Sequence, residues 1–148
     1  MAIKDFRGEF AFLSNFAPCE VEFEGIKFQS TEAAYQAAKT KDLEARKEFR
    51  YLGPGEAKRL GNKIEMRKDW ESIKLGVMEE VLRKKFSTDP YKQRLIDTGD
   101  QDLIEENWWN DTWWGVCKGK GLNNLGKLLM KIREELALNK NEIKNLIT

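Results

Sequence analysis

The sequence contains no histidine among its 148 residues. This absence excludes a histidine general base, a Ser-His-Asp triad and any metal site that needs imidazole ligands. Cysteine is also scarce, because only Cys19 and Cys117 occur, far apart and without the short spacing of a zinc site. We therefore expect no metal, no cofactor and no disulfide framework, and we expect both thiols to be reduced, as in a cytoplasmic protein.

Long apolar runs are missing as well. No segment approaches the roughly 20 apolar residues that cross a membrane, and the first residues, MAIKDFRGEF, lack the apolar core of a signal peptide. Neither sign of charge dominates, because 26 Lys and Arg against 25 Asp and Glu leave a formal net charge of +1. Tight nonspecific binding to long nucleic acid is therefore not expected, although a local basic groove is compatible with these numbers.

The length suits one domain with one hydrophobic core, so we predict a single domain over residues 1–148, with a core at about 6–138 and a tail at 139–148. Apolar residues alternate over residues 20–29 around a Glu24-Gly25 turn, which predicts a short β-hairpin. The rest of the chain has helical patterning. We therefore predict a mainly α fold with one small N-terminal hairpin.

Six helical segments are predicted from apolar spacing and from capping residues. The first three are a helix from Glu32 with Thr31 as its cap, one over about Leu43 to Leu52, and one over Glu56 to Leu60 with Gly61 as its stop. The fourth follows a cap at Asp69 and has one apolar face formed by Trp70, Ile73, Val77, Met78, Val81 and Leu82. The fifth is capped by Thr88 or Asp89 and ends before Gly99, and the last has the stripe Leu125, Leu128, Leu129, Ile132 and Leu136.

Without histidine or a metal site, the chemistry left to this chain uses carboxylates, lysines, tyrosines and bound water. Cleavage of a glycosidic bond suits this set, because a carboxylate can stabilise its oxocarbenium-like transition state or activate water. Glu32 and Asp111 are the two candidate acids. The structural alternatives are an acid that favours a helix N-terminus for Glu32 and a side chain that closes a turn for Asp111.

Four of the five tryptophans lie between Asn107 and Gly115, where neither helical nor strand spacing explains them. Binding groups gather on loops that a rigid scaffold holds in place. Trp114 is therefore a candidate stacking platform, with core packing as the ordinary alternative.

Lys39 lies seven residues after Glu32, two turns along the same helix face. A lysine at that place can bind a phosphate or, if it loses its water shell, attack a sugar aldehyde. Lys58 and Arg67 are similar candidates for phosphate contact. The alternative for Lys39 is a solvated surface lysine.

Seven short elements, in order, resemble those of the NADAR (YbiA-like) family, and together they extend over roughly residues 6 to 136. They are FLSNF (12–16), STEAAYQAAK (30–39), PGEAKRLG (54–61), RKDW (67–70), LIDTGD (95–100), DTWWG (111–115) and GLNNLG (121–126). The resemblance implies a mainly α, YbiA-like fold. It also implies an N-glycosidase that acts on ribosylated or ADP-ribosylated substrates, either intermediates of riboflavin biosynthesis or ADP-ribose carried by guanine in nucleic acid.

The resemblance assigns catalytic positions to Glu32 and Asp111, with Lys39 as a covalent variant. It assigns substrate binding to Ser14, Asn15, Tyr35, Lys58, Arg67, Trp70 and Trp114. Implied partners are a small ribosyl or ADP-ribosyl substrate, ADP-ribosylated DNA or RNA, and functional pairing with an ADP-ribosyltransferase toxin, with no membrane. The doubled Trp113-Trp114 is bulkier than the family pattern, which leaves open which ring contacts the substrate.

Two other classes of function compete with this one. A noncatalytic module that binds ADP-ribose or nucleotides would keep the aromatic and basic positions without needing both acids. A partner-binding protein would instead expose Trp108, Trp109 and Trp113 as interface anchors. The enzyme hypothesis predicts aromatic side chains in a concave pocket with Glu32.

Overall fold

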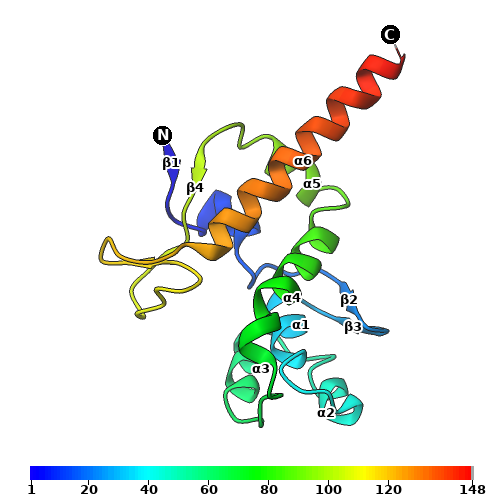
Figure 1. Ribbon diagram of the computed structural model, residues 1–148, viewed down its shortest axis with the longest axis vertical. Helices are drawn as coiled ribbons and strands as arrows, with labels where there is room; N and C mark the ends of the chain where they lie inside the picture. The colour runs from blue at the N-terminus through cyan, green and yellow to red at the C-terminus, as the bar shows by residue number, and fades with distance from the viewer. Residues whose placement is uncertain (148) are drawn as a thin grey trace. The chain divides into compact units, whose positions relative to one another are not determined.

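The computed structural model describes residues 1–147, which group into two compact units (Figure 1). The first unit is formed by residues 1–13 and 86–147, and the second by Ser14–Lys85. Helices predominate in both units, and every strand is only two or three residues long. The predicted mainly α fold is therefore confirmed.

The second unit begins with the predicted hairpin and continues as helices. Val21 pairs with Phe28 and Phe23 pairs with Ile26 in an antiparallel register, and these four side chains are buried on one face. Gly25 has a positive φ of 87°, which a two-residue turn between strands requires. The elements are β2 (Val21–Phe23), β3 (Ile26–Phe28), α1 (Thr31–Ala37), α2 (Leu43–Lys47), α3 (Pro54–Gly61) and α4 (Trp70–Lys85).

Helix α1 is the centre of the second unit, because all seven of its residues are buried. It packs against α3 and α4, which lie beside it in Figure 1. Small side chains at Ala33, Ala34 and Ala37 let these helices approach closely. At the contact with α3, a Cβ added at Gly61 would collide with the end of the Gln36 side chain, so a larger residue there would force Gln36 to move.

The first unit is built around the long helix α6. Its predicted stripe is confirmed at Leu125, Leu128, Leu129 and Ile132, which are buried against α5 and β4, whereas Leu136 is half-buried. The elements are β1 (Ala2–Ile3), a 3-10 helix (Gly8–Leu13), α5 (Tyr91–Ile96), β4 (Asp102–Leu103), β5 (Glu106–Asn107), β6 (Val116–Cys117) and α6 (Asn124–Ile147).

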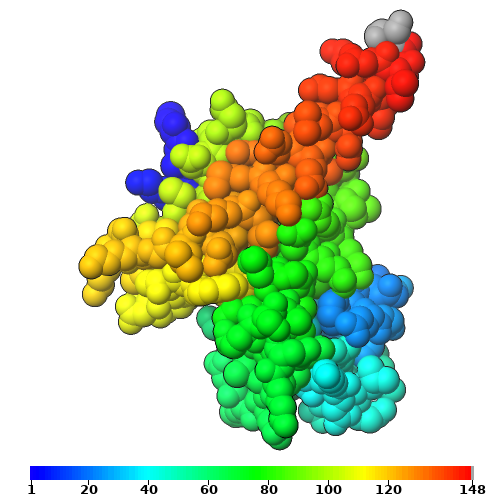
Figure 2. All heavy atoms as spheres, viewed as in Figure 1, coloured from blue at the N-terminus to red at the C-terminus, as the bar shows by residue number. Residues whose placement is uncertain are grey.

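Two parallel strand pairs, β1 with β4 and β5 with β6, were not predicted. Each strand has only two residues, so no alternating pattern can develop in the sequence. Helix α6 continues through the tail to Ile147, and its side chains from Leu138 onward are exposed. In Figure 2 these last turns (red) stand clear of the rest of the first unit on the visible face.

Several predicted helix ends were wrong. Ser30 caps α1 in place of Thr31, because the Ser30 hydroxyl accepts from the backbone N–H of Ala33 over 3.0 Å, whereas the Thr31 hydroxyl donates to Asn15 Oδ1 over 2.7 Å. Helix α2 ends at Lys47 and not near Leu52. Helix α3 ends at Gly61, as predicted, but it begins at Pro54 and not at Glu56.

Asp69 directly precedes α4, but its carboxylate pairs with Arg67. The α4 stripe is confirmed at Trp70, Val77 and Met78 and beyond, with Ile73 half-buried. None of the helices in the described part of the chain is long and apolar enough to cross a membrane.

Candidate active site

The start of α1 is fixed by the loop that precedes the hairpin. The backbone carbonyl of Asn15 accepts from the backbone N–H of Glu32 over 3.2 Å, and the Asn15 side chain accepts from the Thr31 hydroxyl. Asn15 Nδ2 in turn faces Met78 Sδ on α4 at 3.5 Å. Asn15 therefore ties the first turn of α1, which carries the candidate acid Glu32, to α4.

Glu32 is buried, with 8% of its surface exposed. Its Oε1 accepts from Gln36 Nε2, one turn later on α1, over 3.3 Å. A carboxylate that only stabilises a helix N-terminus can do so while it stays in water. Burial of a charged side chain costs free energy, so such side chains are seldom buried without a partner. Burial together with an amide donor fits a carboxylate kept for chemistry.

Lys39 is also buried, with 9% exposure, so the alternative of a solvated surface lysine was wrong. Burial lowers the pKa of Lys39, the charge of Glu32 opposes that shift, and the nearby charges of Lys58 and Lys74 lower the pKa further. Lys39, just after the end of α1, thus lies close enough to interact with Glu32 on α1, Lys58 on α3 and Lys74 on α4. These four residues form the Glu32 cluster. Such a cluster can bind a phosphorylated substrate.

Tyr35 and Trp70 form an aromatic pair between α1 and α4. Their ring centroids are 5.1 Å apart and tilted by 58°, and Trp70 is 3% exposed. This contact agrees with the core position that the α4 spacing predicts for Trp70. Any role of this pair in substrate binding stays a prediction.

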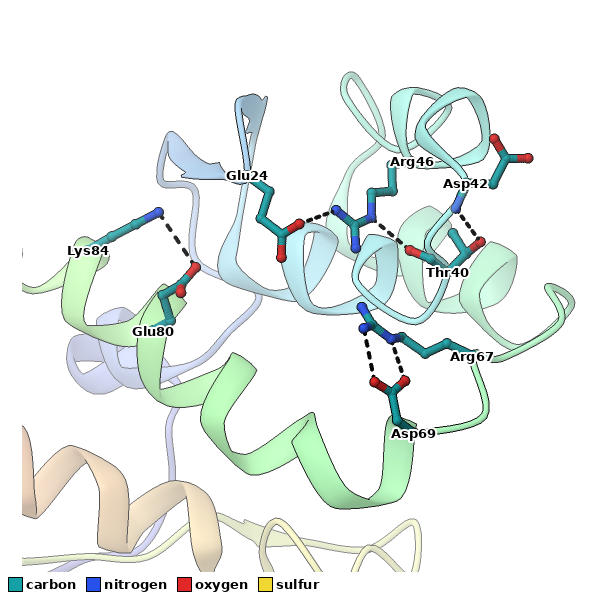
Figure 3. A network of polar contacts seen from close by, with 8 residues as sticks. All are labelled: Glu24, Thr40, Asp42, Arg46, Arg67, Asp69, Glu80 and Lys84. Carbon is teal, nitrogen blue, oxygen red and sulfur yellow. Dashed lines mark hydrogen bonds and ion pairs between the residues drawn. The ribbon is translucent and has the colours of Figure 1, made fainter.

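The segment that follows Lys39 is held from two sides. The Arg67 backbone N–H donates to the Lys39 carbonyl over 2.7 Å, and buried Arg46 donates through Nε to the Thr40 carbonyl over 2.7 Å. Figure 3 shows Arg46 also bound to Glu24 of the hairpin turn, at 2.9 Å. Arg46 therefore joins α2, the hairpin and the end of α1.

The Arg67 guanidinium is bound by Asp69 through two hydrogen bonds of 2.6 and 3.1 Å (Figure 3). This pairing holds the pKa of Asp69 below its ordinary value. Arg67 lines a cleft of about 700 Å³ between residues 40–45 and 64–69. Glu32 and Lys39 do not line that cleft.

Ser14 contributes its backbone more than its hydroxyl. The hydroxyl closes a local turn by accepting from the Phe16 N–H at 3.0 Å. The carbonyl accepts from the ammonium of Lys85, a fully buried residue at the end of α4, over 2.8 Å. Burial lowers the pKa of Lys85 to about 7, and the charge of Cys19 opposes that shift.

The other two predicted residues, Asp111 and Trp114, belong to the first unit. Asp111 Oδ1 accepts from the backbone N–H groups of Trp113 and Trp114 at 3.1 and 2.8 Å. This is the turn-closing role that was the alternative for Asp111. Trp113 and Trp114 are half-buried and meet edge to face, with centroids 4.5 Å apart.

The remaining loop tryptophans are exposed, which agrees in part with the prediction of the partner-binding alternative. Trp108 and Trp109 are 66% and 46% exposed, as that alternative predicts, whereas Trp113 is half-buried. Arg7 lies over the Trp108 ring, with its guanidinium carbon 4.6 Å from the centroid. These two rings are surface features of the first unit.

Eight of the ten predicted site residues therefore belong to the second unit. Sequence reasoning missed Gln36, Arg46 and Lys74. Gln36 could have been predicted, because it lies four residues after Glu32 in the same family-like element. Arg46 and Lys74 could not, because only tertiary packing brings them to the site. Within residues 1–147, no group of three or more Cys, Asp or Glu side chains is placed to hold a metal ion.

Comparison with known proteins shows which families and proteins this chain resembles. The NADAR domain family matches residues 4–137. N-glycosidase YbiA of Escherichia coli is 37% identical over 137 residues, which cover 89% of this chain and 85% of that protein. A riboflavin biosynthesis protein of Vibrio vulnificus is 36% identical over 129 residues, which cover 84% of this chain but only 35% of that longer protein.

The fold agrees with a solved structure. The NMR structure of the E. coli protein YbiA matches 95% of this chain and 88% of its own, with a TM-score of 0.83 and 36% identity. The match of family, sequence and fold extends over both units, well beyond the α1 element alone. The chain belongs to the NADAR domain family.

Proposed function

We propose that this chain is an N-glycosidase, which hydrolyses the bond between a ribose C1 and a nitrogen of a ribosylated or ADP-ribosylated substrate. The observation that carries the proposal is the buried Glu32 carboxylate beside buried Lys39, with Lys58 and Lys74 close by. Relatives named N-glycosidase in E. coli and in Nostoc punctiforme, each 37% identical to this chain, support the same activity.

Hydrolysis needs a water molecule and a group that tolerates positive charge on the sugar. The C1–N bond breaks with its electron pair going to nitrogen, which takes up a proton, while water adds to C1 and loses a proton. Glu32 stabilises the cationic sugar and accepts the proton of the water. Asp111 is the second candidate for either task.

Lys39 is assigned to the phosphate of the substrate, together with Lys58. Arg67, which is paired with Asp69 and lines the neighbouring cleft, is a separate candidate for phosphate contact there. A covalent variant uses the same amine, since burial lowers the pKa of Lys39 and so favours the neutral form. In that variant the amine displaces the base nitrogen from C1 of the ring-opened ribose, and water then hydrolyses the imine. Borohydride would trap that imine on Lys39.

The first substrate is a ribosylamino-pyrimidine phosphate, which the riboflavin biosynthesis protein of Vibrio vulnificus supports by its name. The second is ADP-ribosyl guanine in DNA or RNA, together with pairing to an ADP-ribosyltransferase toxin, which rests on the family resemblance. The proposed location is the cytoplasm, because Cys19 and Cys117 are both thiols without a disulfide.

The test is to incubate the purified chain with both substrates. Release of ribose 5-phosphate from the pyrimidine supports the first assignment, and release of ADP-ribose from a modified oligonucleotide supports the second. If neither bond breaks but a ligand raises the thermal midpoint of unfolding, a noncatalytic binding module replaces the enzyme.

A further inference from the structure

Gln36 faces the Glu32 carboxylate from one turn further along α1. Its Nε2 donates to Glu32 Oε1 over 3.3 Å, and only 4% of Gln36 is exposed. Water competes little with a hydrogen bond in such a buried place, so this contact acts more strongly on the carboxylate than a surface contact would.

The other end of the Gln36 amide faces α3. Gln36 Oε1 is buried and accepts no hydrogen bond within residues 1–147, and it lies against Gly61 of α3, where no Cβ would fit. A half turn of the amide would place Oε1 against the carboxylate oxygen and replace attraction with repulsion. The donor end is therefore the one that faces Glu32.

We propose that Gln36 is a positioning residue that holds the Glu32 carboxylate in place and in its ionised form. The inference rests on the proposed function, since it concerns the acid assigned to hydrolysis. Other charged groups around Glu32 are Lys39 just after α1, Lys58 on α3 and Lys74 on α4. These three cations remain when Gln36 alone is replaced, so the variant isolates the amide.

Gln36→Leu is the test variant, because it removes the donor and keeps a similar volume. A donor favours the charged carboxylate, so its loss raises the pKa of Glu32. We expect kcat/KM to fall about threefold at pH 5 and to stay nearly unchanged at pH 8. If Gln36→Leu does not fold, Gln36→Met is used in its place, because methionine also lacks the amide donor.

Gln93→Leu is the matched control. Gln93 Nε2 donates to Asp97 Oδ1 over 2.7 Å with the same four-residue spacing, but on the exposed surface of α5. We expect this control to leave the pH profile of kcat/KM unchanged. A loss in Gln36→Leu that is equal at pH 5 and pH 8 would overturn the inference.

A readout without turnover separates this inference from the proposed function. In protein with 13C-labelled glutamate, the Glu32 carboxyl signal is assigned by its absence in Glu32→Gln and titrated by NMR. A higher midpoint in Gln36→Leu than in wild type supports the role of Gln36 even where no substrate is cleaved, in which case only the proposed function fails. An unchanged midpoint overturns the inference.

Discussion

Lys85 shows how a single buried charge can shape the stability of this fold. It is fully buried and its ammonium meets the Ser14 carbonyl at 2.8 Å. Burial removes the ammonium from its water shell and so disfavours the charged form, which lowers the pKa of Lys85 to about 7. The unfolded chain keeps an ordinary lysine, so the two states differ in bound protons.

This difference predicts that the free energy of unfolding rises with pH above about 7. Between pH 7.5 and 8.5 the unfolded state holds nearly one proton more at Lys85, so wild type gains about 1 kcal/mol. In Lys85→Met that gain is absent, while Ser14 keeps the Ala17 N–H at 3.1 Å as a donor. Urea unfolding of wild type and Lys85→Met at the two pH values measures this gain. An equal change in the free energy of unfolding in both proteins would disprove the prediction.

Asp111 has a structural task that must be separated from the proposed catalytic one. Asp111→Ala removes the acceptor of two backbone N–H groups and is expected to cost about 1 kcal/mol. Asp111→Asn keeps an oxygen acceptor, so we expect unchanged stability and a fall in kcat/KM of about 100-fold. Urea unfolding and initial rates distinguish the two roles. A fully active Asp111→Asn variant would show that Asp111 only closes the turn and has no catalytic role.

At the scale of elements, the contact between α1 and α3 sets the position of Gln36 and hence of Glu32. Gly61 makes this contact, because the Gln36 side chain occupies the space that a Cβ would need. The sequence pattern suggested a helix stop at Gly61, since glycine often ends helices. Close packing, which sequence spacing does not reveal, is the reason for the glycine.

Gly61→Ala is therefore expected to lower the free energy of unfolding by about 1–3 kcal/mol and to reduce activity. Gly76→Ala is the control inside α4, where an added Cβ meets nothing within 4 Å. That control should raise the free energy of unfolding by about 0.5–1 kcal/mol, since alanine favours a helix. Urea unfolding measures both changes. Equal effects of Gly61→Ala and Gly76→Ala on the free energy of unfolding would contradict the close contact at Gly61.

At the scale of the whole molecule, the family match ends at residue 137 while α6 continues to Ile147. Side chains from Leu138 to Ile147 are exposed. Removal of residues 139–148 is thus expected to cost less than about 1 kcal/mol and to leave kcat/KM unchanged. Urea unfolding and rate measurements on the shortened chain check this, and a loss of activity would give the tail a function.

Patterns of local spacing predicted the hairpin, the α4 and α6 stripes and the family elements, because each depends on neighbours along the chain. The burial of Lys39 and the approach of Lys74 were not predictable in this way, since both arise where helices distant in sequence pack. Two-residue strands also leave no pattern. The roles of the predicted site residues stay predictions, now with contacts that define how to test them.

The most direct test of the central claim compares wild type with Glu32→Gln on the ribosylamino-pyrimidine phosphate and the ADP-ribosyl oligonucleotide. Glu48→Gln, a change at an exposed acid at the end of α2, is the matched control. We predict that wild type and Glu48→Gln cleave one of the N-glycosidic bonds, and that Glu32→Gln folds normally but loses at least about 100-fold in kcat/KM. Equal rates in all three proteins, or no cleavage by wild type, would contradict the account.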